Sequence, residues 1–444
     1  MPEATSPPRI TVIGTGYLGA THAACMAKLG FEVLGVDVDE AKVKSLAAGE
    51  VPFYEPGLQA LLEEQIHAGR LRFTTSFEEA GEFGDVHFVC VGTPQRPDSL
   101  AADLSHVDAA VSALAPHLHR PALVVGKSTV PVGTAAQLEQ MLTVTAPAGE
   151  QVALAWNPEF LREGHAVDDT LSPDRLVFGV RRPRDEQTLR TVYARAIEAG
   201  TPVVTTDFAT AELVKVSANA FLATKISFIN AVAEVCEVVD ADVVALADAI
   251  GHDERIGRQF LNAGLGFGGG CLPKDIRAFM ARAGELGAQD ALAFLREIDA
   301  VNMRRRQRAV ELTKEALGGS VLGARVAVLG VAFKPDSDDV RDSPALNVAG
   351  QLQLQGAQVR VFDPKAIDNA RRVFPTLTYA RSVDEACEHA DVVLHLTEWQ
   401  EFTEIDPRRL RSVVSRPVVV DGRNRLDAAA WRAAGWTYRA LGRP

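Results

Sequence analysis

The sequence has few cysteines, an acidic balance and no long apolar run, and each of these deficits excludes a class of protein. Its five cysteines stand singly, which argues against a metal cluster or a disulfide framework and fits a reducing compartment. The net charge of −12 argues against general binding of nucleic acid or anionic membranes. No apolar segment approaches the roughly 20 residues of a membrane span, and the short polar segment Met1–Pro8 is unlike a signal peptide. We therefore expect a cytoplasmic protein without a bound metal.

The order of apolar segments predicts an α/β fold of two Rossmann-like doubly wound domains joined by a helical central domain with a long central helix. Short β-rich runs alternate with helical stretches up to about residue 206, and the pattern begins again at Arg325, as in parallel sheets covered by helices. Residues 207–249 contain no glycine or proline and repeat apolar residues at helical spacing. We expect domains at 1–206, 207–319 and 320–444. The basic run at 304–308 is expected to be the solvated face of a helix. Strands are expected at Ile10–Ile13, Phe31–Val36, Val86–Val91, Ala122–Val125, Val152–Ala155, Leu176–Val180, Pro202–Thr205, Arg325–Gly330, Gln358–Asp363, Asp391–Leu396 and Pro417–Asp421.

The first lobe opens on a glycine pattern that is typical of dinucleotide binding. Gly14, Gly16 and Gly19 follow an expected strand and precede a helical stretch, where they allow a tight turn, approach of a pyrophosphate and close helix packing. Asp37 ends the next strand, where a carboxylate can bond both ribose hydroxyls and repel a 2′-phosphate. We expect NAD rather than NADP; a glycine-rich turn without a ligand is the alternative. The second lobe has a matching acid, Asp363, but lacks these glycines, so it is expected to bind something else.

A single cysteine follows the glycine-rich run 264–270. Pro273 suits the first turn of a helix, so Cys271 is expected at a helix N-terminus beside Lys274. There its pKa would be lowered toward the nucleophilic thiolate, and the bare backbone before it would permit close approach of a ligand. A buried structural cysteine is the alternative. Asp275 lies four residues on, so thiol and carboxylate could share one helix face.

Two further stretches lie in the expected first lobe. The hydroxyl-rich run 127–134 lies just beyond an expected strand end, where α/β proteins place ligands, although an N-cap cluster has the same composition. In the run 156–164, Pro158 is expected to open a helical turn that sets Glu159 and Glu163 on one face. Two like charges placed in this way repel each other unless a ligand or another group binds them.

On the expected central helix, Lys215 and Asn219 lie four residues apart inside an apolar pattern. A lysine in such a setting either extends its ammonium to solvent or holds an anion. Without the other motifs, the pattern favours extension of the ammonium to solvent.

Taken in order, these motifs resemble the UDP-glucose 6-dehydrogenase family of NAD-dependent nucleotide-sugar dehydrogenases over nearly the whole chain. The segments that carry the resemblance are Gly14–Gly19, Tyr54–Leu58, Val91–Pro94, Ser128–Thr134, Asn157–Gly164, Lys215 with Asn219, Phe267–Asp275, Phe333–Pro335 and Asp421–Arg423. The resemblance implies a homodimer or higher oligomer with NAD as cofactor. It also implies four-electron oxidation of UDP-glucose at C6 to UDP-glucuronate, in which Cys271 forms a thiohemiacetal and then a thioester that water hydrolyses.

The resemblance also implies roles for single residues. Lys215 and Asn219 would stabilise the developing oxyanion. Asp275 would act with a water as acid–base partner, assisted by Thr129, and Glu159 would handle the hydrolytic water. Cofactor contacts are implied for Gly14, Gly16, Tyr17, Leu18, Gly19, Asp37, Lys42, Thr93, Thr129, Glu163, Lys274 and Arg341. Substrate contacts are implied for Glu159, Phe160, Leu161, Glu163, Lys215, Asn219, Phe260, Leu261, Asn262, Ala263, Gly264, Gly268, Lys334 and Arg423, and for Arg255 of a neighbouring subunit, with the helix near 207–239 as dimer core.

Two other interpretations stay open. One is the same chemistry on another nucleotide sugar, such as GDP-mannose or a UDP-N-acetylhexosamine, because pocket shape sets the identity of base and sugar. Many members carry serine before the cysteine and those acting on acetamido sugars often carry histidine; this chain has Gly270. The other is a catalytically silent sugar-nucleotide sensor, which is disfavoured by the joint presence of Cys271, Lys215, Asn219 and Asp275. A two-electron dehydrogenase would need no nucleophile.

Overall fold

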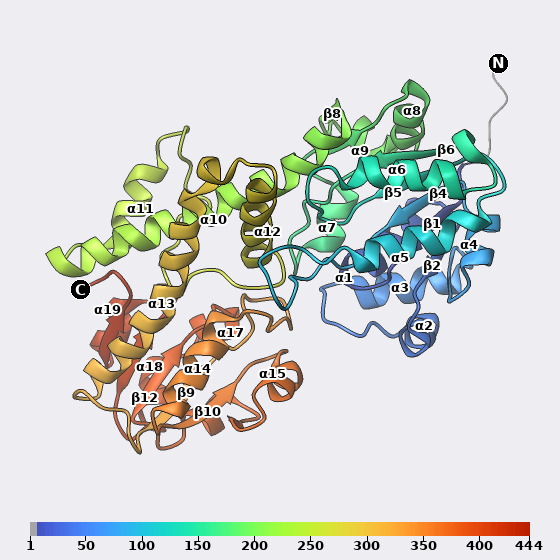
Figure 1. Ribbon diagram of the computed structural model, residues 1–444. Coiled ribbons are helices and arrows are strands. Elements are labelled where there is room, and N and C mark those ends of the chain that lie inside the picture. Colours follow the sequence, from blue (N-terminus) through green and yellow to red (C-terminus); the bar gives the residue numbers. More distant parts are fainter. Residues whose placement is uncertain (1–6) are drawn as a thin grey trace. The chain divides into compact units, whose positions relative to one another are not determined.

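The computed structural model describes residues 7–444, and the chain forms two compact units, Met1–Ala218 and Asn219–Pro444. We call them the N-terminal and C-terminal units. Each is built on one sheet, of eight and six strands respectively (Figure 1). Helix α10 (Phe208–Val239) is continuous through the boundary between them. In the described part of the chain, no helix has the length and apolarity needed to cross a membrane.

The sheet of the N-terminal unit has the strand order β3-β2-β1-β4-β5-β6-β7-β8. Its first six strands follow the order of a doubly wound dinucleotide-binding fold. Every neighbouring pair is parallel except β6 with β7. Most strands are buried along their whole length, as expected where helices cover both faces of a sheet. The strands are β1 (Ile10–Ile13), β2 (Val33–Val36), β3 (Leu71–Thr74), β4 (Val86–Val89), β5 (Ala122–Gly126), β6 (Val152–Trp156), β7 (Leu176–Gly179) and β8 (Val203–Thr206).

Short helices connect these strands, and side-chain caps fix where several of them begin. Asp39 accepts from two backbone N–H groups at the start of α2, and Ser76 accepts from one at the start of α4, as such residues do at helix N-termini. The helices are α1 (Tyr17–Lys28), α2 (Glu40–Ala47), α3 (Leu58–His67), α4 (Phe77–Phe83), α5 (Ser105–Leu114), α6 (Thr134–Thr145), α7 (Ala166–Leu171), α8 (Pro183–Val192) and α9 (Ala194–Glu198).

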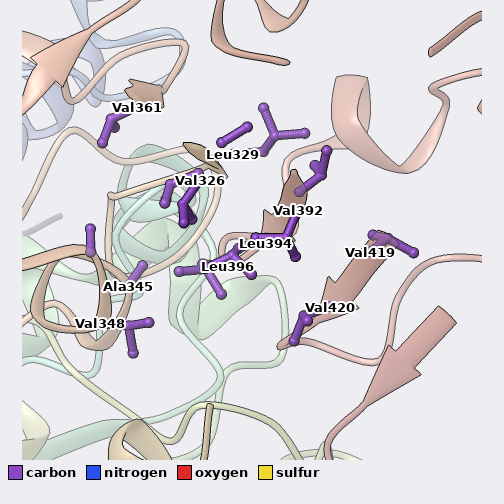
Figure 2. Packing of buried hydrophobic residues seen from close by; sticks show 14 of the residues in the cluster. Val326, Leu329, Ala345, Val348, Val361, Val392, Leu394, Leu396, Val419 and Val420 are labelled. Atoms are coloured by element: carbon purple, nitrogen blue, oxygen red, sulfur yellow. The ribbon is translucent and has the colours of Figure 1, made fainter. Parts of the chain in front are cut away.

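The C-terminal unit combines a helical region with an entirely parallel sheet of order β11-β10-β9-β12-β13-β14. Figure 2 shows part of its core, where strand residues such as Val326 and Leu394 lie near Ala345 and Val348 of α14. The strands are β9 (Arg325–Leu329), β10 (Gln358–Phe362), β11 (Thr378–Tyr379), β12 (Val392–His395), β13 (Val418–Asp421) and β14 (Thr437–Ala440). The helices are α11 (Val243–Gly251), α12 (Leu272–Glu285), α13 (Phe294–Ala316), α14 (Pro344–Leu354), α15 (Ile367–Val373), α16 (Val383–Cys387), α17 (Gln400–Thr403), α18 (Pro407–Arg411) and α19 (Ala428–Ala433).

The predicted fold class is confirmed, and each predicted strand is present with ends that agree within two residues. The strands that were missed, β3, β11 and β14, lie at sheet edges or are only partly buried, so they lack a continuous apolar run. The central helix ends at Val239, because Asp240 takes a left-handed conformation with φ of 61° and the Asp242 side chain caps the new helix α11. The division into three domains stays a prediction.

Candidate functional site

The turn between β1 and α1 fits a dinucleotide. Gly14 has φ of +85°, and a side chain there would lie 2.6 Å from Val91; one at Gly19 would clash with the Gly14 carbonyl oxygen. Turn geometry and helix packing therefore require these two glycines. A side chain at Gly16 would meet no atom within 4 Å, so Gly16 leaves open space at the N-terminus of α1, where a helix favours an anion. The residues of this turn thus leave room for a pyrophosphate.

Asp37 follows β2 and is bound by the same turn. Its Oδ2 accepts from Thr15 N at 2.8 Å, Thr15 Oγ1 at 3.1 Å and Lys42 Nζ at 2.9 Å. Burial raises the Asp37 pKa, but these donors outweigh burial and leave the pKa below its ordinary value. Asp37 is therefore ionised at neutral pH, the state that accepts from ribose hydroxyls and repels a 2′-phosphate.

The second lobe repeats this carboxylate-to-turn arrangement without the glycine pattern. Asp363 Oδ2 accepts from Val331 N at 2.8 Å, Ala332 N at 3.0 Å and Trp399 Nε1 at 3.2 Å. The resemblance between the two lobes therefore extends to the role of the acid after the second strand.

The ends of β4 and β5 bring the predicted hydroxyls together. Ser128 Oγ donates to Val91 O at 2.7 Å, and Thr93 Oγ1 donates to Thr129 O at 2.8 Å. The two strands are parallel neighbours, and such carboxyl ends are where these sheets bind ligands. The alternative of an N-cap cluster is wrong, because the N-terminus of α6 is capped by Glu212 of α10, which accepts from Gly133 N at 2.8 Å and Ala135 N at 2.7 Å.

The segment after β6 differs from the prediction. Residues 157–163 are not helical and α7 begins only at Ala166, so the predicted helical face shared by Glu159 and Glu163 is wrong. The Glu159 carboxylate instead accepts from Leu161 N at 2.6 Å, which closes a local turn. The N-terminus of α7 is capped by Glu55, whose carboxylate accepts from Gly164 N and Ala166 N, both at 2.7 Å. Tyr17 OH also donates to Glu55.

Glu159 and Lys215 form a buried ion pair in the N-terminal unit. Lys215 Nζ lies 2.9 Å from Glu159 Oε1, and the two side chains are 6% and 12% exposed. Burial raises the Glu159 pKa, but Lys215 and the Leu161 N–H hold that pKa below its ordinary value. The ammonium also lies 5.6 Å from the centre of the Phe160 ring. Lys215 therefore holds an anion and does not extend to solvent.

Cys271 lies at the N-cap of α12 and is exposed, with Pro273 in the first turn. Asp275 N donates to Cys271 O at 3.0 Å, so the helical hydrogen bonding begins at the cysteine. The other four cysteines are buried, and burial raises the thiol pKa to about 12 in Cys25, Cys90 and Cys387 and also raises it in Cys236. Cys271 is thus the accessible thiol, and the alternative of a buried structural cysteine is wrong.

Asp275 is buried one turn into α12 and joins this helix to α10. Its Oδ2 accepts from Asn219 Nδ2 at 2.6 Å, and its Oδ1 accepts from Lys274 Nζ at 2.6 Å. Asp275 and Asn219 are only 2% and 7% exposed, so the carboxylate is paired as a buried charge must be. Lys215 precedes Asn219 by one turn of α10, so one helix carries a member of each cluster.

The glycine-rich run before Cys271 is packed closely against protein. A side chain at Gly266 or Gly269 would meet Asn302 or the Phe333 ring. Asn302 accepts from Phe267 N at 2.7 Å and donates to Phe267 O at 3.0 Å. The bare backbone predicted for a ligand is therefore also a requirement of packing.

The basic run in α13 is only partly a solvated face: Arg304 and Gln307 are exposed, but the prediction is wrong for Arg305 and Arg306. Arg305 is fully buried and Arg306 is 2% exposed. Arg305 Nη2 lies 3.1 Å from Glu237 Oε1, and its Nε donates to Gly264 O at 3.4 Å. Arg306 Nη2 donates to Phe267 O at 3.4 Å, and its Nη1 pairs with Asp342 at 2.7 Å. Both guanidinium groups therefore bind the loop that leads to Cys271, a use for which their planar donor array is suited.

The remaining implied residues have varied surroundings. Arg423 donates to the carbonyl oxygens of Leu396 at 2.7 Å and of Gly266 and Phe333 at 3.1 Å, so it braces the loop before Cys271. The Arg255 side chain is 89% exposed. In the segment 260–263, Phe260 has φ of 64°, Leu261 and Ala263 are buried, and Asn262 Oδ1 accepts from Arg258. Lys334 Nζ lies 5.6 Å from the centre of the Phe333 ring. Arg341 forms an ion pair with Asp339 at 2.7 Å. The cofactor candidates Lys274 and Arg341 belong to the C-terminal unit, the others to the N-terminal unit.

Three family models match successive parts of the chain. They are the NAD binding domain of the UDP-glucose/GDP-mannose dehydrogenase family at residues 8–197, its central domain at 209–304 and its UDP binding domain at 327–428. The chain belongs to the UDP-glucose/GDP-mannose dehydrogenase family. It is an NAD-dependent oxidoreductase, as predicted.

Individual relatives match the sequence of this dehydrogenase over nearly their full length. The chain is 43% identical to UDP-glucose 6-dehydrogenase of Rhizobium meliloti over 98% of this chain and 100% of the relative. It is 40% identical to UDP-glucose 6-dehydrogenase TuaD of Bacillus subtilis over 98% and 93% of the two chains. The structure of a UDP-glucose dehydrogenase from Pyrobaculum islandicum has a TM-score of 0.91, with 38% identity and full coverage of both chains.

Several residues of this dehydrogenase that shape the clusters were not predicted as site residues. Glu212 caps α6, Asn302 and the two buried arginines hold the cysteine loop, and Lys127 lies beside the segment that carries Glu159. A signal for the arginines was present, because Asn302, Arg305 and Arg306 continue the helical spacing of the buried residues Ala309 and Val310. Charge in the run concealed that spacing.

Proposed function

We propose that this chain oxidises UDP-glucose at C6 to UDP-glucuronate in a four-electron reaction. The observation that carries the proposal is the exposed Cys271 at the N-cap of α12, one turn from a buried Asp275 bonded to Asn219. A thiol is required to retain the aldehyde and to oxidise it further, whereas a two-electron dehydrogenase has no use for one.

In the proposed reaction the C6 alcohol first loses a hydride and its hydroxyl proton, which gives an aldehyde. The Cys271 thiolate forms a C–S bond to the aldehyde carbon, and the oxygen takes up a proton to give a thiohemiacetal. Loss of a second hydride and of that proton gives a thioester. Water then attacks the carbonyl carbon, the C–S bond breaks, sulfur leaves as thiolate, and the carboxylate and protons are released. NAD, when bound, accepts the hydride in each oxidation, so two NADH form per sugar.

The residues divide these tasks by their chemistry. Lys215 and Asn219 are proposed to stabilise the negative oxygen formed when the thiolate adds, since preorganised donors in a dry site are most effective there. Asp275, with a water and assisted by Thr129, is proposed to move the alcohol proton. Glu159, ionised beside Lys215, is proposed to orient the hydrolytic water. The remaining cofactor and substrate contacts implied by the resemblance are part of this proposal.

Product stoichiometry tests the reaction type. Purified protein with limiting UDP-glucose and excess NAD should form about two NADH per sugar. A ratio near one would exclude the four-electron scheme. GDP-mannose and UDP-N-acetylhexosamines in parallel reactions test the alternative substrates, and faster turnover of either would replace UDP-glucose in the proposal.

Removal of the thiol tests the nucleophile. Cys271→Ala should abolish acid formation, while NAD still protects the N-terminal unit against thermal unfolding, because the glycine turn is unchanged. Acid formation at the wild-type rate would remove Cys271 from the mechanism.

We further propose a homodimer formed through α10 and a cytoplasmic location. On α10, Phe221, Phe228 and Val235 recur every seven residues and are 66%, 53% and 61% exposed, a spacing that gives one apolar stripe along a helix. Exposed apolar stripes of this kind mark protein–protein contacts. All five cysteines are free thiols, as in proteins of a reducing compartment.

A further inference from the structure

A pocket in the N-terminal unit extends from the protein surface to a buried lysine. Its cavity volume is about 40 Å³. Asp174 and Arg175 line its outer part, whereas His22, Lys127 and Glu159 line its inner part. Lys127 and Glu159 therefore line the same pocket, although 32 positions separate them in the sequence.

The Lys127 ammonium contacts neutral oxygens and aromatic rings. Nζ donates to Asn157 Oδ1 at 3.0 Å, to Asn157 O at 3.5 Å and to Tyr193 OH at 3.3 Å. It also lies 5.8 Å from the ring centres of Phe88 and Tyr193. The residue is 7% exposed, and within residues 7–444 no carboxylate forms an ion pair with it.

Packing alone does not account for a cation in this position. Burial of an ammonium without a carboxylate partner is unfavourable, and it lowers the Lys127 pKa to about 8. A methionine would fill similar space without that cost. The charge must therefore act on something within reach, and the group it acts on is Glu159, whose carboxylate is stabilised by Lys215 and also by Lys127.

We propose that Lys127 is a positioning residue for Glu159, which it serves by holding both the side chain and the main-chain carbonyl of Asn157. Asn157 is fixed on its other sides, since its N–H donates to Gly126 O at 2.8 Å and its Nδ2 donates to Val177 O at 3.0 Å. Glu159 follows two residues later and bonds Lys215. Lys127 thus fixes the start of the segment that presents the carboxylate. This inference rests on the proposed function, in which Glu159 orients the hydrolytic water.

The charges around Lys127 give the inference a pH dependence. His22 faces Lys127 from α1, and burial and the nearby Lys127 charge hold its pKa well below the usual value, so it is neutral. Burial raises the pKa of the Cys90 thiol and of the Tyr193 hydroxyl, so these groups are also neutral near pH 8. Glu159 and Lys215 remain as the charged pair. Loss of the Lys127 proton therefore removes the second cation from this cluster and loosens its hold on Asn157.

Two variants of Lys127 and one of Glu159 test the inference. In Lys127→Met, acid formation should slow by about 10- to 100-fold, as a displaced catalytic group would cause, with the KM for NAD unchanged. Lys127→Arg, which keeps a cation, should restore part of the rate. In wild type, the rate should fall above about pH 8, and this fall should be absent in Lys127→Met. Glu159→Gln should show a loss of similar size, and Lys127→Met/Glu159→Gln should be no slower than the slower single variant, because both changes disable one function.

Controls separate this result from unfolding and from failure of the proposed function. Tyr193→Phe removes a contact with Lys127 and the hydrogen bond that Tyr193 OH donates to Asn157 Oδ1 at 2.6 Å, but it leaves the ammonium on Asn157, so its alkaline limb should match wild type. Lys127→Met should resist urea at least as well as wild type. A Lys127→Met enzyme with the wild-type rate and pH profile, or losses that multiply in the double variant, would overturn the inference. If Lys127→Met does not fold, a wild-type rate that is flat from pH 7 to 9 would overturn it equally. Wild type that fails to form two NADH per UDP-glucose would instead overturn the proposed function.

Discussion

At the scale of single residues, the loop before Cys271 requires glycine where neighbouring atoms occupy the position of a side chain. Gly266 has φ of +88°, and the space where its side chain would be is taken by Asn302 Oδ1. The same Asn302 oxygen accepts from Phe267 N. A side chain at Gly266 would thus displace the residue that holds the loop in place.

Gly266→Ala should therefore lower the free energy of unfolding by about 1–3 kcal/mol, the range for backbone strain at one position, and should slow acid formation. Urea unfolding followed by fluorescence measures the first effect. Gly284→Ala is the matched control, because Gly284 lies in α12 with no atom within 4 Å of an added side chain, and alanine there should stabilise by roughly 0.5 kcal/mol. Equal stability of Gly266→Ala and wild type would contradict this account of the loop.

At the scale of elements, α13 holds the cysteine loop through side chains that are charged yet buried. Arg305→Met should lower the free energy of unfolding by about 3 kcal/mol, because it removes a fully buried guanidinium that bonds Glu237 and the Gly264 carbonyl. Arg304→Met should change it by less than about 0.5 kcal/mol, since Arg304 is 51% exposed and lies 3.6 Å from Glu234. Urea midpoints of the two neighbouring variants make the comparison, and similar losses in both would show that burial of the guanidinium is not the cause.

The apolar stripe of α10 gives a second prediction at this scale. Phe228→Asp should convert the proposed dimer to monomers, because it places a charge in the middle of the buried contact. Leu354→Asp changes an equally apolar residue that is 88% exposed at the end of α14 and should leave the assembly unchanged. Sedimentation at micromolar concentration distinguishes the outcomes; a Phe228→Asp protein with the wild-type mass would exclude α10 as the contact.

Helices and strands were predictable where residues close in the sequence determine them. They were not predictable where contacts with residues distant in the sequence determine them. Buried strands and the start of α12 at Pro273 depend on runs and spacings that the sequence displays. The surroundings of Glu159 were not predictable, because Glu55, distant in the sequence, accepts from the N-terminus of α7, and the segment before α7 is not helical. Likewise, the glycines before Cys271 indicated close approach, but the sequence did not show that Asn302 is one of the approaching groups.

At the scale of the whole molecule, buried histidines make stability depend on pH. Burial is the main cause that lowers the His87 pKa, to about 3, and it also lowers the His22 pKa. The folded chain therefore binds fewer protons than the unfolded chain between about pH 3 and 6.5. The contribution of these histidines to stability is fully present above about pH 6.5 and falls as pH decreases through this window, with about 2 kcal/mol lost to His87 alone at pH 5.

His87→Asn tests this dependence, because an amide can keep a hydrogen bond to Thr11 Oγ1, now 2.7 Å from His87 Nδ1, and does not titrate. The variant should be less stable than wild type at pH 8 but should lose less on acidification to pH 5. Chemical denaturation at both pH values measures the difference. An identical loss in the two proteins would mean that His87 is not a source of the acid sensitivity.

Because Cys271 is exposed and the other four cysteines are buried, the native chain can be labelled at a single position. A maleimide dye added at neutral pH should attach once, at the first turn of α12, whereas denaturant should expose five targets. The fluorescence of that dye would then report events at the cysteine loop without any engineered attachment point.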